Sequence, residues 1–329
     1  MTVPGKVKKM NFKIISILIL FLLLISFAVS AQYLEVALVS DVGGFKDSSY
    51  NQQLRNSLNK VAENLNLKTA YRESDLMTEY QDNLNYFAEN NFDLIWGVGS
   101  TMEQAVKEAA QMYPETNFVL FDGIVGEENV MSLTFKRKEE AFLAGVVAAL
   151  ASENAKVSFI GGQKTEKIGH YQLGFETGVK SVNSEIEIIS RYVGSFNDFS
   201  AAKEISAELA AENVDLIFYA AGPSSRGIIE TALEKNIKLI SLDAADIDLA
   251  PNNMVTAVLK NTDHLVKMLI ENYSNDNYVN EIKEFGLADN AFVLEQDQLS
   301  DMLSSEKRTK IEEYKQQFLA GEIEIPSAP

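Results

Sequence analysis

The first side chains that could bind a ligand follow an apolar, strand-like run near the start of the sequence. Asp41 ends that run, and Tyr50 and Asn51 come after a pair of glycines, Gly43 and Gly44. In an open α/β sheet, ligands bind at the carboxyl ends of the strands, where such a turn leads into a helix. A carboxylate, an aromatic ring and a carboxamide at one strand end suit a flat ligand with hydrogen-bonding edges better than a phosphate or a metal ion.

Further candidate residues stand at the ends of later predicted strands. They are Asp122, Phe135, Gly162, Gly222, Asp243 and Lys260. Each has an ordinary alternative, because an acid can cap the next helix, a glycine can form a turn and a strand-end lysine can be solvated. As a set they fall at the same edge of two predicted lobes, and two facing edges form a cleft with converging polar groups. We therefore predict a small-molecule site in that cleft.

Alternating strand and helix patterns position these side chains. The predicted strands are residues 35–40, 68–71, 94–97, 117–122, 130–135, 156–161, 186–193, 216–220, 238–242 and 254–259. Helical patterns with apolar residues every three or four positions lie between them, for example over residues 50–64 and 167–182. Repeated β–α units predict parallel sheets with helices on both faces, so the fold class is α/β.

A coarse internal repeat predicts two similar, Rossmann-like lobes. Residues 94–122 are predicted to form a strand, a glycine turn, a helix and a strand that ends in Asp, and residues 216–243 repeat this plan. The chain would cross between the lobes near residues 135–138 and again near residues 244–253, where Asp, Pro and Asn interrupt regular structure. The strand after the second crossing would then begin the return to the first lobe.

The predicted boundaries follow from these crossings. We expect lobe 1 to comprise residues 32–136 and about 250–285, and lobe 2 to comprise residues 137–249 and about 286–329. The ligand cleft would lie between the two lobes. The tail over residues 299–319 has the pattern of one charged amphipathic helix.

Composition excludes several function classes. The chain has 329 residues, enough for two domains, and a formal net charge of −18, so we do not expect it to bind nucleic acid. Without cysteine it has no disulfide, thiolate metal site or cysteine nucleophile. A P-loop lysine motif is missing, the run from Gly97 to Met102 lacks the third glycine of a dinucleotide fingerprint, and the two histidines, His170 and His264, lie far apart. We therefore expect no cofactor and no metal-assisted or histidine-based catalysis.

The N-terminus has the pattern of a secretory signal. Four lysines precede the uncharged apolar residues 14–29, and small residues follow up to Ala31. We expect residues 1–31 to be a signal peptide cleaved after Ala31, which places the mature protein outside the cytoplasmic membrane. The alternative is an uncleaved membrane anchor, because the apolar run approaches the roughly 17 residues that can span a bilayer.

Several short motifs together carry a family resemblance. Beginning with Ser40-Asp41-Val42-Gly43-Gly44, they occupy residues 40–44, 47–51, 94–99, 113–118, 129–135, 142–145, 160–162, 174–179 and 192–196. In order and spacing they resemble the basic membrane protein family, the PnrA-like purine-nucleoside receptors of ABC importers. The resemblance covers about residues 34–262.

This resemblance implies a type I periplasmic-binding-protein fold whose two lobes close on a nucleoside. Tyr50, where the family usually has Phe, would stack on the base, and an aromatic residue near Phe218 or Tyr219 would supply the second stacking face. Asn51 and Asp122 would hydrogen-bond the edge of the base, with Asp41 nearby. The ribose hydroxyls would be held by Asp243, Gly222 and Lys260. The candidate ligand-binding set also includes Phe135 and Phe175.

The resemblance further implies an extracytoplasmic solute-binding protein that presents a nucleoside, in particular a purine nucleoside, to an ABC permease and its ATPase. The chain would associate with the membrane through that transporter or through an uncleaved leader. It departs from the family pattern at Ala31-Gln32, where a lipidated cysteine would stand, at residues 223–226 in place of a glycine-rich turn, and after Asp243, where alanine replaces a second acid.

Two alternative functions remain open at this point. A receptor of the same fold could sense the ligand in the same cleft and signal through a partner protein. A nucleoside hydrolase could use the acids of the cleft, but it would need a metal cluster or a positioned base that the sequence does not reveal.

Overall fold

The computed structural model describes residues 33–46, 49–65, 67–275 and 277–327. The predicted leader, residues 1–31, lies outside the described residues. In the described part, no helix combines the length and the apolar character needed to span a membrane.

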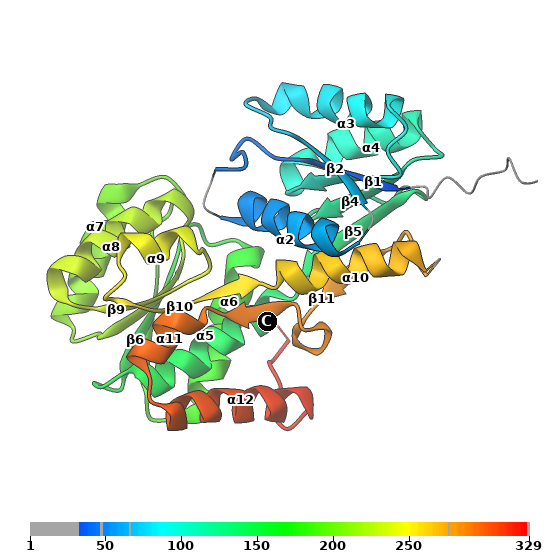
Figure 1. The fold of residues 1–329 in the computed structure, drawn as a ribbon. Helices are drawn as coiled ribbons and strands as arrows, with labels where there is room; N and C mark the ends of the chain where they lie inside the picture. Colours follow the sequence, from blue (N-terminus) through cyan, green and yellow to red (C-terminus); the bar gives the residue numbers. More distant parts are fainter. Residues whose placement is uncertain (1–32, 47–48, 66, 276, 328–329) are drawn as a thin grey trace, which may run out of the picture.

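The first lobe is built on a parallel sheet with the strand order β11-β5-β4-β3-β1-β2 (Figure 1). Its strands are β1 (Leu34–Val39), β2 (Leu67–Arg72), β3 (Leu94–Val98), β4 (Asn117–Phe121), β5 (Val130–Phe135) and β11 (Ile282–Phe285). The helices of this lobe are α2 (Tyr50–Asn64), α3 (Tyr80–Glu89), α4 (Glu103–Met112) and α10 (Thr262–Ser274). The central strands are apolar along almost their whole length because helices cover both faces of the sheet.

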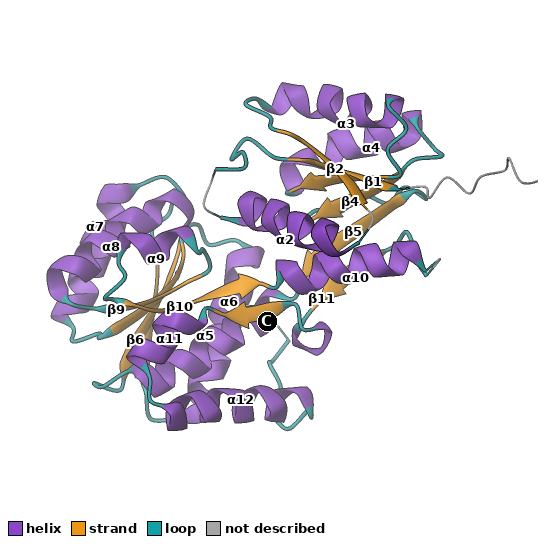
Figure 2. Cartoon of the chain, viewed as in Figure 1, coloured by secondary structure: helices purple, strands orange, loops and turns teal. Residues whose placement is uncertain are grey.

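The second lobe repeats this plan with the strand order β12-β10-β9-β8-β6-β7 (Figure 2). Its strands are β6 (Lys156–Gly161), β7 (Glu187–Tyr192), β8 (Leu216–Ala220), β9 (Lys238–Ser241), β10 (Met254–Lys260) and β12 (Phe292–Leu294). Its helices are α5 (Arg137–Ala151), α6 (Glu166–Val182), α7 (Phe199–Ala211), α8 (Ser225–Lys235), α9 (Ala245–Leu249), α11 (Gln296–Met302) and α12 (Ser305–Leu319). All strand pairs of this sheet are parallel except β10–β12. The predicted α/β class with two lobes of parallel strands is confirmed.

The chain passes between the two sheets three times. The passages lie between β5 and α5, between β10 and α10, and between β11 and β12. Because β10 pairs with β9 and β12, the prediction that the chain returns to the first lobe from about residue 250 is wrong. The segment expected to be irregular, residues 244–253, contains α9 and stays in the second lobe, so the return begins only after Lys260.

The predicted C-terminal helix is also divided. It forms α11 and α12, which are separated at Leu303 and Ser304. The Ser304 side chain accepts a hydrogen bond from the Lys307 backbone N–H (3.3 Å) and so caps the N-terminus of α12.

Helices α5 and α6 pack closer together than ordinary side chains allow. A Cβ atom at Gly174 would lie 2.1 Å from the Lys138 carbonyl oxygen, and one at Gly178 would lie 2.2 Å from the Phe142 carbonyl oxygen. Gly145 makes the reciprocal approach, 2.2 Å from the Phe175 carbonyl oxygen. Glycine is therefore required at all three positions, and α5, which begins at the first passage between the lobes, is held firmly against α6.

Candidate functional site

The end of β1 brings Asp41 and Asn51 into direct contact. Asp41 Oδ1 accepts hydrogen bonds from Asn51 Nδ2 (2.8 Å) and from the Gly43 backbone N–H (2.9 Å). In return, the Asp41 backbone N–H donates to Asn51 Oδ1 (3.4 Å). Gly44 has a φ of +67°, which turns the chain toward α2 without the steric cost that a side chain would add. The two predicted residues therefore support each other at the strand end.

Tyr50, the first residue of α2, contacts two other predicted site residues. Its ring packs edge-on against Phe135, with centroids 6.4 Å apart and an interplanar angle of 83°. The Lys260 ammonium lies 5.2 Å from the Tyr50 ring centroid and 5.1 Å from that of Phe135. Phe135 is buried, so it packs against the Tyr50 ring and has almost no surface left to contact a ligand. Tyr50 and Phe135 come from the first lobe and Lys260 from the second, so this cluster lies where the lobes meet.

The Tyr50 hydroxyl is buried and, among the described residues, has no hydrogen-bond partner. Burial raises the pKa of this phenol well above its usual value, and the nearby Asp122 and Glu140 carboxylates raise it further. Tyr50 is therefore neutral at physiological pH.

Asp122 joins the two lobes directly. It follows β4 with a φ of +59°, in the left-handed region that a non-glycine residue rarely adopts. Its Oδ1 is 2.7 Å from an Arg137 guanidinium nitrogen at the start of α5. A ligand that binds Asp122 would therefore meet a carboxylate already paired on one side with a cation from the other lobe.

Three residues of this cluster were absent from the predicted set: Arg137, Glu140 and Tyr171. Glu140 is completely buried, its Oε2 accepts a hydrogen bond from the Tyr171 hydroxyl (3.2 Å), and its Oε1 lies 3.9 Å from the Lys260 ammonium. The available signal was position, because Arg137 lies in the segment predicted to cross between the lobes and Glu140 one helical turn beyond it. A charged run at the start of a helix, however, is usually a solvated face.

The second lobe has a cavity of about 740 Å³ at its strand ends. Three predicted residues, Tyr219, Gly222 and Asp243, line it. Other lining residues are Phe199, Arg226 and Asp246, and all lining residues belong to the second lobe. Pockets of this size accommodate small organic ligands.

A hydrogen-bond network organises the floor of this cavity. Asp246 Oδ2 accepts from the Tyr219 hydroxyl (2.9 Å) and from the Ser241 hydroxyl (2.6 Å). Asp243 Oδ1 accepts from the Ala245 backbone N–H (3.0 Å) and so helps to start α9. Burial raises the pKa of Asp246, although the two hydroxyl donors oppose this shift. Asp246 was not among the predicted site residues.

The glycines at two strand ends share an aromatic neighbour. A Cβ atom at Gly162 would lie 2.3 Å from the Phe196 ring, and one at Gly222 would lie 3.4 Å from it. Gly222 also has a φ of +56°, which suits a turn into the following helix. The half-buried Phe196 is therefore a further aromatic residue at this edge of the sheet.

Phe175 lies in the core. It is completely buried between α6 and the second sheet and stacks on Phe218, with centroids 5.2 Å apart and an interplanar angle of 27°. Phe218 is equally buried, whereas its neighbour Tyr219 points to the opposite face and lines the cavity. Phe175 is therefore a packing residue, and of the two aromatic candidates in β8 only Tyr219 can meet a ligand.

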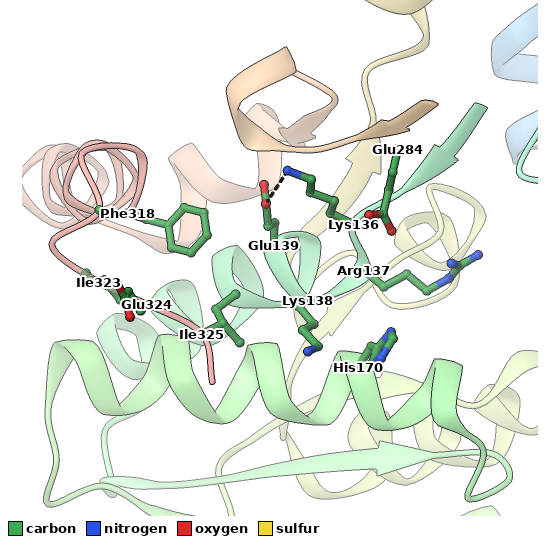
Figure 3. Close-up of a pocket in the computed structure, with 11 residues that line it drawn as sticks. Lys136, Arg137, Lys138, Glu139, His170, Glu284, Phe318, Ile323, Glu324 and Ile325 are labelled. Carbon is green, nitrogen blue, oxygen red and sulfur yellow. Dashed lines mark ion pairs between the residues drawn. The ribbon is translucent and has the colours of Figure 1, made fainter. Parts of the chain in front are cut away.

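A second cavity, of about 550 Å³, lies beside the first passage between the lobes (Figure 3). It is lined by Lys136 of the passage, by Lys138 in the first turn of α5, by His170 of α6, and by Phe318 and Ile325 near the C-terminus. Lys136 pairs with Glu139 at its edge (3.2 Å). No predicted ligand-binding residue lines this cavity. Among the described residues, no cluster of three or more His, Asp or Glu side chains could hold a metal ion.

Comparisons with known proteins agree with this architecture. Over 325 residues the chain is 30% identical to the "CD4+ T-cell-stimulating antigen" of Listeria monocytogenes, covering 91% of this chain and 90% of that protein. It is 34% identical over 208 residues to the "ABC transporter nucleoside-binding protein BmpA" of Lactococcus lactis, covering 62% of this chain and 59% of the relative.

Solved structures share the fold. An ABC transporter solute-binding protein from Conexibacter woesei superposes with a TM-score of 0.78 at 19% identity, covering 89% of this chain and 98% of the other. The family model described as "ABC transporter substrate-binding protein PnrA-like" matches residues 34–328. That match spans both lobes and all three passages between them, so the chain belongs to this PnrA-like family of substrate-binding proteins, the basic membrane protein family.

Proposed function

We propose that the protein captures a nucleoside between its lobes outside the cytoplasmic membrane and presents it to an ABC permease and its ATPase. The observation that carries this proposal is the cluster at the meeting point of the lobes. There an aromatic ring, a lysine ammonium and a hydrogen-bonded Asp–Asn pair converge from separate elements, in a chain with a relative named as nucleoside-binding.

The cluster and the second-lobe cavity together match the parts of a nucleoside. Tyr50 stacks on the base, and such stacking contributes about 1–3 kcal/mol per base. Asn51 and Asp122 hydrogen-bond the edge of the base, with Asp41 holding Asn51 in place. Asp243, Gly222 and Lys260 bind the ribose hydroxyls, and Tyr219 lies on the second-lobe side of the ligand.

Binding closes the cleft because the ligand contacts both lobes only in the closed arrangement. Tyr50 and Asp41 belong to the first lobe, whereas Tyr219 and Asp243 line a cavity made by the second lobe alone. A ligand with higher affinity for the closed state shifts the population toward it, and the three chain passages act as the hinge. No covalent bond changes in this cycle.

A purine nucleoside is the ligand we favour. The larger bicyclic base gives more stacking area to Tyr50, and its edge offers both donors and acceptors to the Asn51 and Asp122 side chains. Buried polar groups reject ligands that leave them unpaired, so a free base and free ribose should both bind weakly.

The family consists of solute-binding proteins rather than enzymes, so the nucleoside hydrolase alternative is not supported. Incubation with inosine should release no hypoxanthine. The receptor alternative uses the same cleft and is distinguished by the partner that recognises the closed form.

A thermal-shift screen followed by isothermal titration calorimetry tests the proposal. We expect inosine, adenosine or guanosine to raise the melting temperature by several degrees at saturation, because a ligand that binds only the folded state stabilises it. Cytidine, uridine, hypoxanthine and ribose serve as matched controls and should give smaller shifts. The absence of a shift with every nucleoside, together with a clear shift from a sugar or an amino acid, would overturn the proposal.

A further inference from the structure

Glu140 is a buried carboxylate that folding alone does not explain. Its side chain is 1% exposed, and Oε2 accepts a single hydrogen bond, from Tyr171. Among the described residues, Oε1 has no hydrogen-bond partner. A well-packed apolar side chain in such a place is often at least as stabilising as a buried charge. The burial of this carboxylate therefore indicates a role other than stabilising the fold.

The cation that Glu140 faces is Lys260. Its Nζ atom is the cation beside Glu140 Oε1, at 3.9 Å, and it lies over the rings of Tyr50 and Phe135. The Lys260 side chain remains 17% exposed, and its ammonium donates no hydrogen bond to any described residue. The N–H groups of Lys260 are therefore available to a ligand, while the Glu140 carboxylate orients the ammonium.

We propose that Glu140 is a positioning residue of the cleft, which holds the Lys260 ammonium over Tyr50 and aims it at the bound ligand. This inference rests on the proposed function, because it assigns Lys260 a ligand contact. Tyr171 of α6 orients the Glu140 carboxylate in turn. The close α5–α6 packing at Gly174 and Gly178 keeps the Tyr171 and Glu140 side chains at a constant separation.

The groups around Glu140 determine how this arrangement responds to pH. Lys260 faces Glu140 from the end of β10, Tyr171 from α6, and Arg137 from α5, the helix that also carries Glu140. Asp122 faces it from the end of β4, and Tyr50 from α2.

Burial raises the pKa of Glu140, opposed by Lys260, Tyr171 and Arg137 and reinforced by Asp122. Glu140 therefore takes up a proton at a less acidic pH than a free glutamate does. Protonation removes the charge that holds Lys260, so affinity for the ligand should fall as the pH is lowered through this raised pKa.

Glu140→Gln and Glu139→Gln form a matched pair of variants. Glu139 is the adjacent carboxylate on the same helical turn, but it accepts a hydrogen bond from the Leu287 backbone N–H and pairs with Lys136, away from Lys260. Titration calorimetry with inosine should show at least tenfold weaker binding for Glu140→Gln and parental binding for Glu139→Gln. As the pH is lowered from 8, the parent should lose affinity at a less acidic pH than a free glutamate would cause, and Glu140→Gln should show little change. Parental affinity and the parental pH profile in Glu140→Gln would overturn the inference.

A measurement without ligand separates this inference from the proposed function. Competitive acetylation by acetic anhydride, read by mass spectrometry at Lys260, reports how readily the reagent reaches this amine. Loss of the Glu140 carboxylate should release the Lys260 side chain from its place over Tyr50 and raise its acetylation rate at pH 8 severalfold, and Glu139→Gln should leave the rate unchanged. An unchanged rate in Glu140→Gln overturns the inference, whether or not inosine binds. If the parent binds no nucleoside, the proposed function fails and the acetylation result alone decides whether Glu140 controls Lys260.

Thermal unfolding of each variant checks that the fold is intact. Glu140→Gln removes a buried charge and should not lower the melting temperature. Should it fail to fold, Tyr171→Phe replaces it, since this change deletes only the hydroxyl that orients Glu140. Tyr171→Phe should weaken inosine binding and raise acetylation of Lys260 in the same direction but by less.

Discussion

The two halves of the proposed site are built in different ways. The cluster around Tyr50 and Lys260 is assembled from both lobes, and the Asp122–Arg137 ion pair within it joins one lobe to the other. The cavity around Tyr219 and Asp243 is formed by the second lobe alone and is organised by hydrogen bonds within that lobe. The comparison indicates that the second-lobe half is preformed, whereas the half at the passages depends on how the lobes are held together.

Among the variants that test this comparison, truncation of the Tyr50 ring should have the largest effect on ligand binding. Tyr50→Ala should weaken nucleoside binding by roughly 10- to 100-fold, because it removes the stacking face, which is worth about 1–3 kcal/mol per base. Titration calorimetry with inosine measures the loss. Tyr50→Phe is the matched control and should bind about as tightly as the parent, since the Tyr50 hydroxyl has no partner among the described residues. Equal affinities for the alanine variant and the parent would remove Tyr50 from the site.

A disturbance of the α5–α6 contact tests the support of the passage cluster. Gly174→Ala places a methyl group 2.1 Å from the Lys138 carbonyl oxygen, so we expect a loss of about 1–3 kcal/mol of unfolding free energy. Gly169→Ala is the control on the same helix, where a Cβ atom would meet nothing within 4 Å. That control should be neutral or stabilising by up to about 1 kcal/mol, because alanine favours the helix. Chemical denaturation measures both, and equal stabilities would contradict the close packing.

In the second-lobe half, Asp243→Asn should weaken inosine binding about tenfold, a loss of about 1.4 kcal/mol, because it removes the carboxylate charge that we propose accepts hydrogen bonds from the ribose hydroxyls. Asparagine can still accept the hydrogen bond from the Ala245 backbone N–H, so α9 and the melting temperature should stay nearly unchanged. A parental affinity would show that Asp243 serves only to start the helix.

The smallest expected effect concerns the pH dependence of stability. The pKa of Asp246 is raised in the folded protein, so its favourable contribution is fully present below the pKa of a free aspartate and is lost as the pH rises through the raised value. The difference in melting temperature between Asp246→Asn and the parent should therefore shift in favour of the variant, by about one or two degrees, from pH 3.5 to pH 7.5. Differential scanning calorimetry at both values checks this. A constant difference between variant and parent would mean that Asp246 titrates normally.

Short-range patterns predicted most of the strand-end residues. The contacts of Tyr50 with Phe135 and Lys260, and the Asp41–Asn51 pair, bring together residues selected from their positions alone. Phe175 shows where such reasoning fails. It stands in a motif of the family, yet it faces the sheet from α6, and sequence position does not reveal which side of a buried helix meets the core.

By itself, the sequence determined the α/β class and the two similar lobes, and it selected the strand ends that we propose as the ligand site. This was possible because apolar periodicity follows directly from which faces of a strand or helix are buried. Only the tertiary structure decided that β10 belongs to the second sheet, since a strand with both faces buried has the same pattern in either lobe. It also decided that Glu140 is buried and that Arg137 is half-buried beside Asp122. Burial of a charge depends on which distant segments pack against it, here the ends of β4 and β10, and those lie 15 and 120 residues away along the chain.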